Sequence, residues 1–132
     1  MTTLHTLGVA EVAALVQRRE VSPVEVVTAC LTRLEALEPT LQAWVSVDRH
    51  SAMAAARRCE QSIQQGDRVG ALTGVPVGLK DIIYTAGLRT AAGSRVYANF
   101  VPTYDATVTV RLQQAGAILL GKTVTKIGRA HV

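Results

Sequence analysis

Segments with helical spacing of apolar residues alternate with short β-branched runs along the 132 residues of this chain. Apolar residues three and four positions apart are typical of an amphipathic helix, and short apolar runs bounded by glycine or proline are typical of a strand. The order helix, helix, strand, helix, strand, helix, strand predicts an α/β fold, in which helices cover a sheet. We expect the helices at 8–19, 23–38, 49–65 and 105–115, and the strands at 43–47, 74–83 and 117–120.

The second helix has the clearest start signal. Ser22 is a preferred N-cap residue, and Pro23 stands at the first helical position, where no N–H is needed. Glu25 completes a Ser-x-x-Glu capping box, and Pro39 is expected to end the helix. Other helix ends are predicted from single residues, namely N-caps at Thr6, Asp48 and Asp105 and terminal glycines at Gly66 and Gly116.

Length and composition exclude several classes of protein. The 132 residues suffice for one domain. No apolar run approaches the roughly 18 residues that a membrane span requires. The first five residues have neither the basic nor the apolar region of a secretory signal. We therefore expect a soluble, cytoplasmic protein with no membrane partner.

Cysteines, histidines and aromatic residues give no sign of a metal, cofactor or nucleic-acid site. Cys30 and Cys59 fall within helical patterns and are expected to be small core residues rather than a disulfide. The three histidines are scattered without metal-ligand spacing, so we expect no metal and no cofactor. Aromatic residues make up only 4% of the chain and the basic residues are dispersed, which argues against a nucleic-acid partner.

Residues 116–123 fit the phosphate-loop pattern G-x-x-x-x-G-K-[ST]. A phosphate loop follows a strand and precedes a helix, because its backbone N–H groups must surround the phosphates. Here a helix precedes Gly116, the residues between the two glycines resemble a strand, and nothing helical follows Thr123. The segment is therefore expected to be a helix–glycine–strand connection and not a nucleotide site.

Lys80 lies within the apolar strand pattern at 74–83. A buried lysine is unfavourable unless it is paired or used, and a desolvated, neutral amine can act as a base. The alternative is that Lys80 reaches solvent at the end of the strand, or pairs with Asp81 or another carboxylate. The spacing alone leaves both interpretations open.

Residues 72–81, Leu-Thr-Gly-Val-Pro-Val-Gly-Leu-Lys-Asp, resemble the lysine-bearing strand of the amidase signature family. Further segments resemble that family in the same order, so the similarity covers residues 6–125. These segments are 22–25, 87–90 with 93–94, 104–112 and 115–123. The resemblance implies the N-terminal part of the amidase signature fold, a mixed sheet flanked by helices that is incomplete in residues 1–125.

The resemblance also implies an enzyme that cleaves carboxamide C–N bonds through a Ser–cis-Ser–Lys triad, with Lys80 as the lysine. Gly78, Asp81, Gly93 and Ser94 are expected to shape the region around it. Both family serines lie downstream in a Gly/Ser-rich stretch that this chain does not contain. We therefore expect the chain alone to be inactive and its parent to act on a small-molecule amide.

Two alternatives to a stand-alone amidase remain. One is the A subunit of a tRNA-dependent amidotransferase. The sequence of residues 115–118 and 121–123 favours the stand-alone amidase over this subunit. The other is a non-catalytic binding module that keeps the fold and has lost its serines.

The last seven residues depart from the family pattern. Residues 127–132 read Ile-Gly-Arg-Ala-His-Val, which is what the start of a common sequencing adapter would encode. We expect residues 126–132 to be a non-native tail from read-through of library DNA, with the native segment at 1–125. Strands that lack their family partners would then leave sheet edges exposed, which predicts poor solubility or homo-oligomers.

Overall fold

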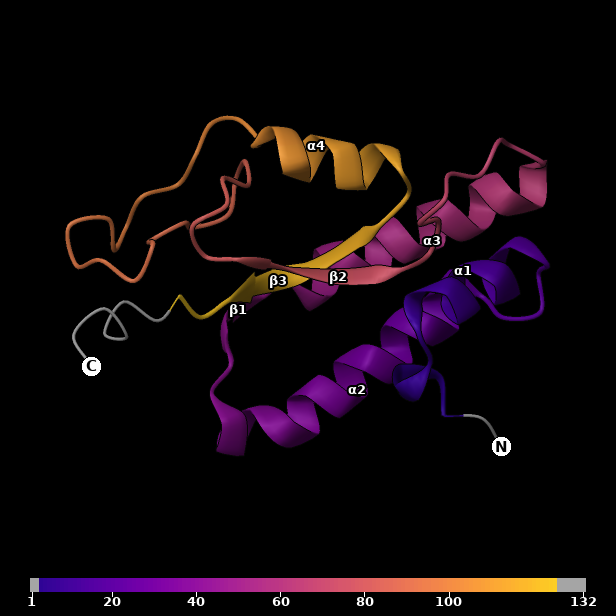
Figure 1. Ribbon diagram of the computed structural model, residues 1–132, viewed down its shortest axis with the longest axis horizontal. Helices are drawn as coiled ribbons and strands as arrows, with labels where there is room; N and C mark the ends of the chain where they lie inside the picture. Colours follow the sequence, from indigo (N-terminus) through magenta and orange to yellow (C-terminus); the bar gives the residue numbers. More distant parts are fainter. Residues whose placement is uncertain (1–2, 126–132) are drawn as a thin grey trace.

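The computed structural model describes residues 3–125 and has a mixed α/β architecture (Figure 1). The predicted α/β fold and the predicted order of elements are therefore confirmed. The predicted tail at 126–132 lies outside the described residues. The elements are η1 (Leu4–Thr6), α1 (Val9–Gln17), α2 (Pro23–Leu41), β1 (Trp44–Val47), α3 (Arg49–Gln65), β2 (Pro76–Lys80), α4 (Thr107–Gln114) and β3 (Ile118–Thr123).

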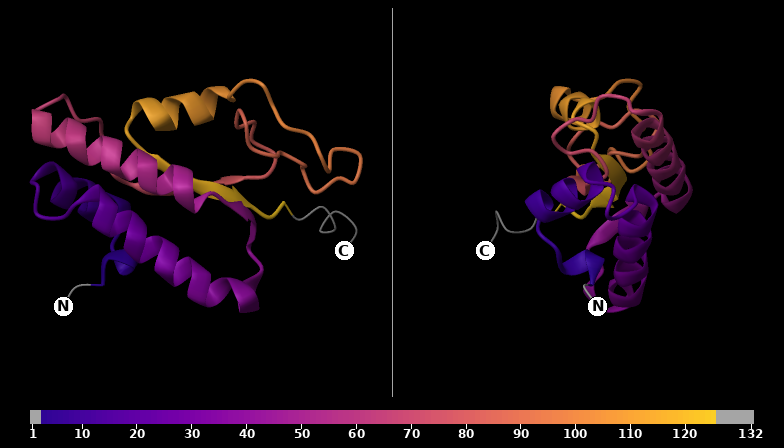
Figure 2. Two further views of the ribbon diagram at one scale, coloured as in Figure 1. Left: turned by 180° about the vertical axis from the view of Figure 1, so that it is seen from behind. Right: turned by 90° about the vertical axis from the view of Figure 1, so that its right-hand side faces the viewer.

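The sheet has the strand order β1-β3-β2, with β3 parallel to β2 and antiparallel to β1. Helices α1 and α2 lie on one side of the sheet, and α4 and the long segment after β2 lie on the other (Figures 1 and 2). Within the described residues, the outer edges of β1 and β2 have no partner strand. Unpaired strand edges can pair with another chain. The expected formation of homo-oligomers through these edges stays a prediction.

Two strand predictions need correction. The strand predicted at 74–83 is shorter, Pro76–Lys80, and within it only Leu79 is buried although the pattern is apolar. The strand predicted at 117–120 continues to Thr123. It continues because Gly121 and Lys122 pair with β1 on one side and β2 on the other. The phosphate-loop match is thus a central strand, as the sequence order indicated.

The start of α2 forms as predicted. Ser22 Oγ accepts a hydrogen bond from Val24 N at 2.9 Å, and Glu25 Oε2 accepts one from Ser22 N at 2.9 Å. The predicted end of this helix was wrong, because Pro39 lies inside it and the helix continues to Leu41. A proline in the last turn removes one backbone donor without stopping the turn, and the helix ends at Gln42 in a left-handed conformation.

The other predicted caps have mixed outcomes. Asp48 caps α3 as expected by accepting a hydrogen bond from Ser51 N at 2.9 Å, and this backbone bond lowers the pKa of Asp48. Gly66 and Gly116 end their helices with positive φ angles of 82° and 94°. The cap predicted at Thr6 was wrong, since α1 begins after Gly8.

The cap predicted at Asp105 was also wrong. Helix α4 begins after Ala106, and no side chain in residues 3–125 caps it. The Asp105 carboxylate instead accepts a hydrogen bond from Ala86 N at 2.7 Å. A contact with a loop 19 residues away has replaced the local cap.

The core has two clusters that share α2 and α3. One cluster lies where α1 meets α2 and β2, and the other lies where α2 and α3 meet β3. Cys30 and Cys59 are half-buried free thiols beside these clusters, as expected for small core residues. Burial raises the pKa of both thiols. No helix in residues 3–125 is long and apolar enough to cross a membrane.

Replacing Ser22 by alanine is expected to reduce the free energy of unfolding by about 1 kcal/mol or slightly more. The variant loses the cap on Val24 N and also the bond that Ser22 Oγ donates to the Glu60 carboxylate on α3. Urea unfolding followed by circular dichroism measures the change. Ser62→Ala is the matched control, because the Ser62 side chain is exposed inside α3 and its loss should change stability by less than about 0.5 kcal/mol. Equal effects of the two substitutions would contradict the role of the cap.

Candidate active site

Lys80 is the last residue of β2 and is half-buried. The described residues contain two ion pairs, Arg18–Glu20 and Arg49–Glu35, and neither involves Lys80. The alternative in which Lys80 pairs with Asp81 is therefore wrong within residues 3–125. Lys80 is half-buried at the end of the strand, so the other alternative, in which its side chain reaches solvent there, stays open.

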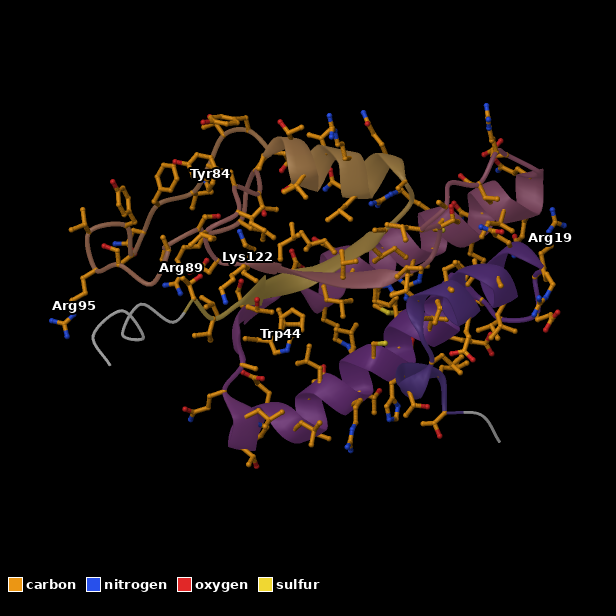
Figure 3. All side chains as sticks on the ribbon, in the orientation of Figure 1. Arg19, Trp44, Tyr84, Arg89, Arg95 and Lys122 are labelled. Atoms are coloured by element: carbon orange, nitrogen blue, oxygen red, sulfur yellow. The ribbon has the colours of Figure 1, made fainter. Side chains whose placement is uncertain are left out.

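Gly78 shares a face of the sheet with Lys80, because alternate residues of a strand point the same way. A Cβ atom on Gly78 would lie 2.6 Å from the ring of Trp44 and 3.2 Å from the Thr123 methyl group. Glycine is therefore needed for the Trp44 ring to lie against β2. Figure 3 shows the Trp44 ring between the sheet and α2.

Asp81 is 1% exposed and bonds to the loop that follows it. Its carboxylate accepts a hydrogen bond from Ala91 N at 3.3 Å, and its carbonyl oxygen accepts one from Ala92 N at 2.8 Å. Its own N–H donates to the Thr123 carbonyl oxygen at 3.0 Å. Asp81 thus joins the end of β2 to β3 and to the far end of the loop.

Gly93 and Ser94 directly follow this joined segment. Ala92 and Gly93 both have left-handed backbones, with φ angles of 53° and 67°. Ser94 Oγ accepts a hydrogen bond from Val96 N at 3.2 Å, and Ser94 N donates to the Ala91 carbonyl oxygen. The Ser94 hydroxyl therefore stabilises a turn. The hydrogen bonds of Asp81 bring Asp81 together with the segment that contains Gly93 and Ser94.

Lys122 is a buried lysine that the sequence analysis did not predict. Its side chain is 0% exposed on β3, the central strand. Leu79 pairs with Lys122 and Lys80 pairs with Thr123, so the two lysines project from opposite faces of the sheet. The available signal was the one that drew attention to Lys80, a lysine within an apolar strand pattern. Lys122 also falls within the phosphate-loop pattern at 116–123.

Burial lowers the pKa of Lys122, and the negative charges of Asp81 and Asp105 oppose this shift. Figure 3 shows the side chain extending from β3 toward the segment that carries Tyr84 and Arg89. Residues 3–125 contain no group of three or more histidine, cysteine or acidic side chains that could hold a metal ion.

The family model for amidases matches residues 25–129, so the chain belongs to the amidase signature family. The match extends four residues past the predicted boundary at 125, and that boundary stays a prediction.

The most similar relatives include the A subunit of the glutamyl-tRNA(Gln) amidotransferase from Chloroflexus aurantiacus. It is 45% identical over 122 residues, which are 92% of this chain and 25% of the relative. Among solved structures, the peptide amidase of Stenotrophomonas maltophilia is 34% identical with a TM-score of 0.82, over 89% of this chain and 24% of that one. A bacterial aryl acylamidase is 29% identical with a TM-score of 0.85, over 92% of this chain and 26% of that one.

The chain spans about a quarter of the length of the curated relatives that it matches. The matched part of these proteins is their amidase signature fold, which confirms the predicted fold. The assignment of Lys80, Gly78, Asp81, Gly93 and Ser94 to the site stays a prediction based on the resemblance.

Proposed function

We propose that this chain is the N-terminal part of an amidase that cleaves carboxamide C–N bonds of small molecules, with Lys80 as its base. The observation that carries the proposal is the position of Lys80, half-buried at the end of β2 and without a carboxylate partner in residues 3–125. A carboxylate at ion-pair distance would hold the lysine in its charged form, in which it cannot accept a proton.

In the proposed reaction, Lys80 acts as the base that removes a proton from a bridging serine. The bridging serine in turn removes one from the nucleophilic serine, which attacks the amide carbon. Backbone N–H groups bind the oxyanion. The proton passes back along the same chain to the leaving amine, and water then releases the carboxylic acid from the acyl-enzyme. Both serines belong to the part of the family fold that follows this chain.

The amidotransferase A subunit is the second candidate. The relatives of that name reach 45% identity, and a relative with an amidase name from Mycobacterium bovis reaches 43%. The two identities are too close to decide between the alternatives. Ammonia release from glutamine that depends on tRNA and on a partner protein would favour the amidotransferase, whereas release from simple amides without them favours the amidase.

The first test is the DNA sequence from the codon for Lys80 past the codon for Thr125, amplified again from its source. We expect a reading frame that continues into a Gly/Ser-rich stretch with two serines. A stop directly after Val132 would contradict the proposal and favour a non-catalytic module.

The 132-residue chain by itself is expected to release no detectable amine from aryl or aliphatic amides, since two of the three triad members are absent. Amine release is measured by a fluorogenic assay, with the protein of the complete reading frame as the positive control. Turnover by the short chain that Lys80→Ala abolishes would contradict this prediction.

A further inference from the structure

Lys122 places its ammonium group inside the loop that follows Lys80. Lys122 Nζ donates hydrogen bonds to the Ile83 carbonyl oxygen, to Thr85 Oγ1 at 3.1 Å and to Thr90 Oγ1 at 2.9 Å. We call these four residues the Lys122 cluster. Thr85 and Thr90 are each 3% exposed and Ile83 is half-buried, so the cluster is largely shielded from water.

The cluster suits a charged lysine. An ammonium group has three N–H donors and no acceptor, and each donor has one acceptor here. The Thr85 hydroxyl donates its own proton to the Ile83 carbonyl oxygen, and the Thr90 hydroxyl donates to the Leu88 carbonyl oxygen. Both hydroxyls therefore turn a lone pair toward Lys122. Asp81 and Asp105 supply negative charge nearby without forming an ion pair with it.

The loop that the cluster holds is connected directly to Lys80. Ile83 N donates to the Lys80 carbonyl oxygen at 2.9 Å, and Ile83 in turn accepts from Lys122. At the other end, Thr90 is followed by Ala91 and Ala92, which bond to Asp81. Residues 81–92 thus close on Asp81, and three of them accept hydrogen bonds from the Lys122 ammonium.

Backbone bonds to the following segment also hold the loop: Gly87 N donates to the Pro102 carbonyl oxygen at 3.1 Å, and Thr90 N donates to the Phe100 carbonyl oxygen at 2.9 Å. The loop contributes no helix or strand between Lys80 and Thr107. Its remaining contacts include bonds from Ala106 N and Thr109 Oγ1 to the Tyr84 carbonyl oxygen, each 2.9 Å long. These bonds join the loop to the start of α4, whereas the Lys122 cluster draws Ile83, Thr85 and Thr90 to one point on β3.

We propose that Lys122 is a positioning residue, whose buried ammonium group holds residues 83–90 on β3 and thereby fixes the strand end from which Lys80 acts. The inference rests on the proposed function, because it assigns Lys122 a role in the same reaction. Lys122 does not touch the reacting atoms, since it projects from the face opposite to Lys80. The lysine of the phosphate-loop pattern serves this purpose instead of binding phosphate.

Lys122→Met tests the proposal in the protein of the complete reading frame, because methionine keeps most of the volume and loses all three hydrogen bonds. We expect kcat to fall roughly 10- to 100-fold while KM changes less than about threefold, since a displaced base impairs the chemical step more than binding. Thr90→Val removes one acceptor and should give a smaller loss of the same kind. The matched control is Thr73→Val, a buried threonine outside the cluster, which should leave kcat unchanged.

Two measurements test whether Lys122 holds the loop, and neither requires an activity assay. A slowly exchanging lysine ammonium signal should appear in the ¹H–¹⁵N spectrum of the wild type and vanish in Lys122→Met. Amide hydrogen exchange of residues 81–92 should accelerate in Lys122→Met and Thr90→Val and not in Thr73→Val. If Lys122→Met does not fold, Thr85→Val with Thr90→Val provides the same comparison with the lysine retained.

An unchanged kcat in the cluster variants, or a change in KM alone, would overturn the positioning role. Unchanged exchange at residues 81–92 would overturn the structural role. An inactive wild-type protein would instead overturn the proposed function and the catalytic half of this inference, while the exchange data still decide whether Lys122 holds the loop.

Discussion

Replacing Lys80 by alanine is expected to lower kcat/KM of the protein of the complete reading frame by about 10³-fold or more. A positioned general base contributes about 10²- to 10⁴-fold, and the loss here also leaves the nucleophilic serine without activation. Because Lys80 has no ion-pair partner in residues 3–125, its removal leaves no unpaired carboxylate behind. The variant should therefore fold as the wild type does, and amine release from an aryl amide measures the loss.

Two further substitutions separate the base from the charge and from the shape of the side chain. Lys80→Arg keeps a positive charge that cannot be lost at accessible pH, and Lys80→Met keeps the approximate shape. Both should be as inactive as the alanine variant. Arg111→Ala, which removes an exposed cation from α4, should keep full activity. Substantial activity in Lys80→Arg would contradict the assignment of Lys80 as a base.

Replacing Gly121 by alanine is expected to reduce the free energy of unfolding by about 3 kcal/mol, the largest stability effect that we predict. A Cβ atom at this position would lie 2.1 Å from the Ser46 carbonyl oxygen and 2.9 Å from Val47 Cα. Both are backbone atoms of β1, and Gly121 pairs with Val47 across the sheet. Neither strand can withdraw without breaking the ladder, because β3 is also paired with β2.

The matched control is Gly87→Ala in the loop after β2. Nothing lies within 4 Å of a Cβ atom there, but the φ angle of Gly87 is 76°, so only the backbone conformation opposes the substitution. A change of about 1 kcal/mol is expected. Urea unfolding of both variants provides the comparison. A loss at Gly121 no larger than that at Gly87 would show that β1 does not pack against β3 as described.

The helix starts that could be predicted are those whose partners lie within a turn. Ser22 and Asp48 cap backbone N–H groups two or three residues away, so their neighbours in the sequence contain the whole interaction. The caps that failed were replaced by other contacts. Asp105 bonds to Ala86 across a loop, and α1 starts at Val9, directly after Gly8, whose N–H donates to the Glu11 carboxylate.

The candidate site also contains one feature that the sequence predicted and others that it did not. Lys80 was found from the sequence because a lysine in an apolar run is unusual, and because the residues around it resemble the amidase signature family. The connections of Asp81 to Ala91 and Ala92 have no local signature. They depend on how a loop closes, which the sequence pattern does not report.

The sequence alone therefore determined the α/β class, the main helices and the lysine-bearing strand, since these follow from spacing and short-range capping chemistry. Only the tertiary structure decided how far the strands extend, the order β1-β3-β2 and the burial of Lys122. The partners of Lys122 lie 32 to 39 residues away along the chain. An ammonium group can be buried only where three such acceptors converge, and that convergence exists only after the loop has folded onto β3.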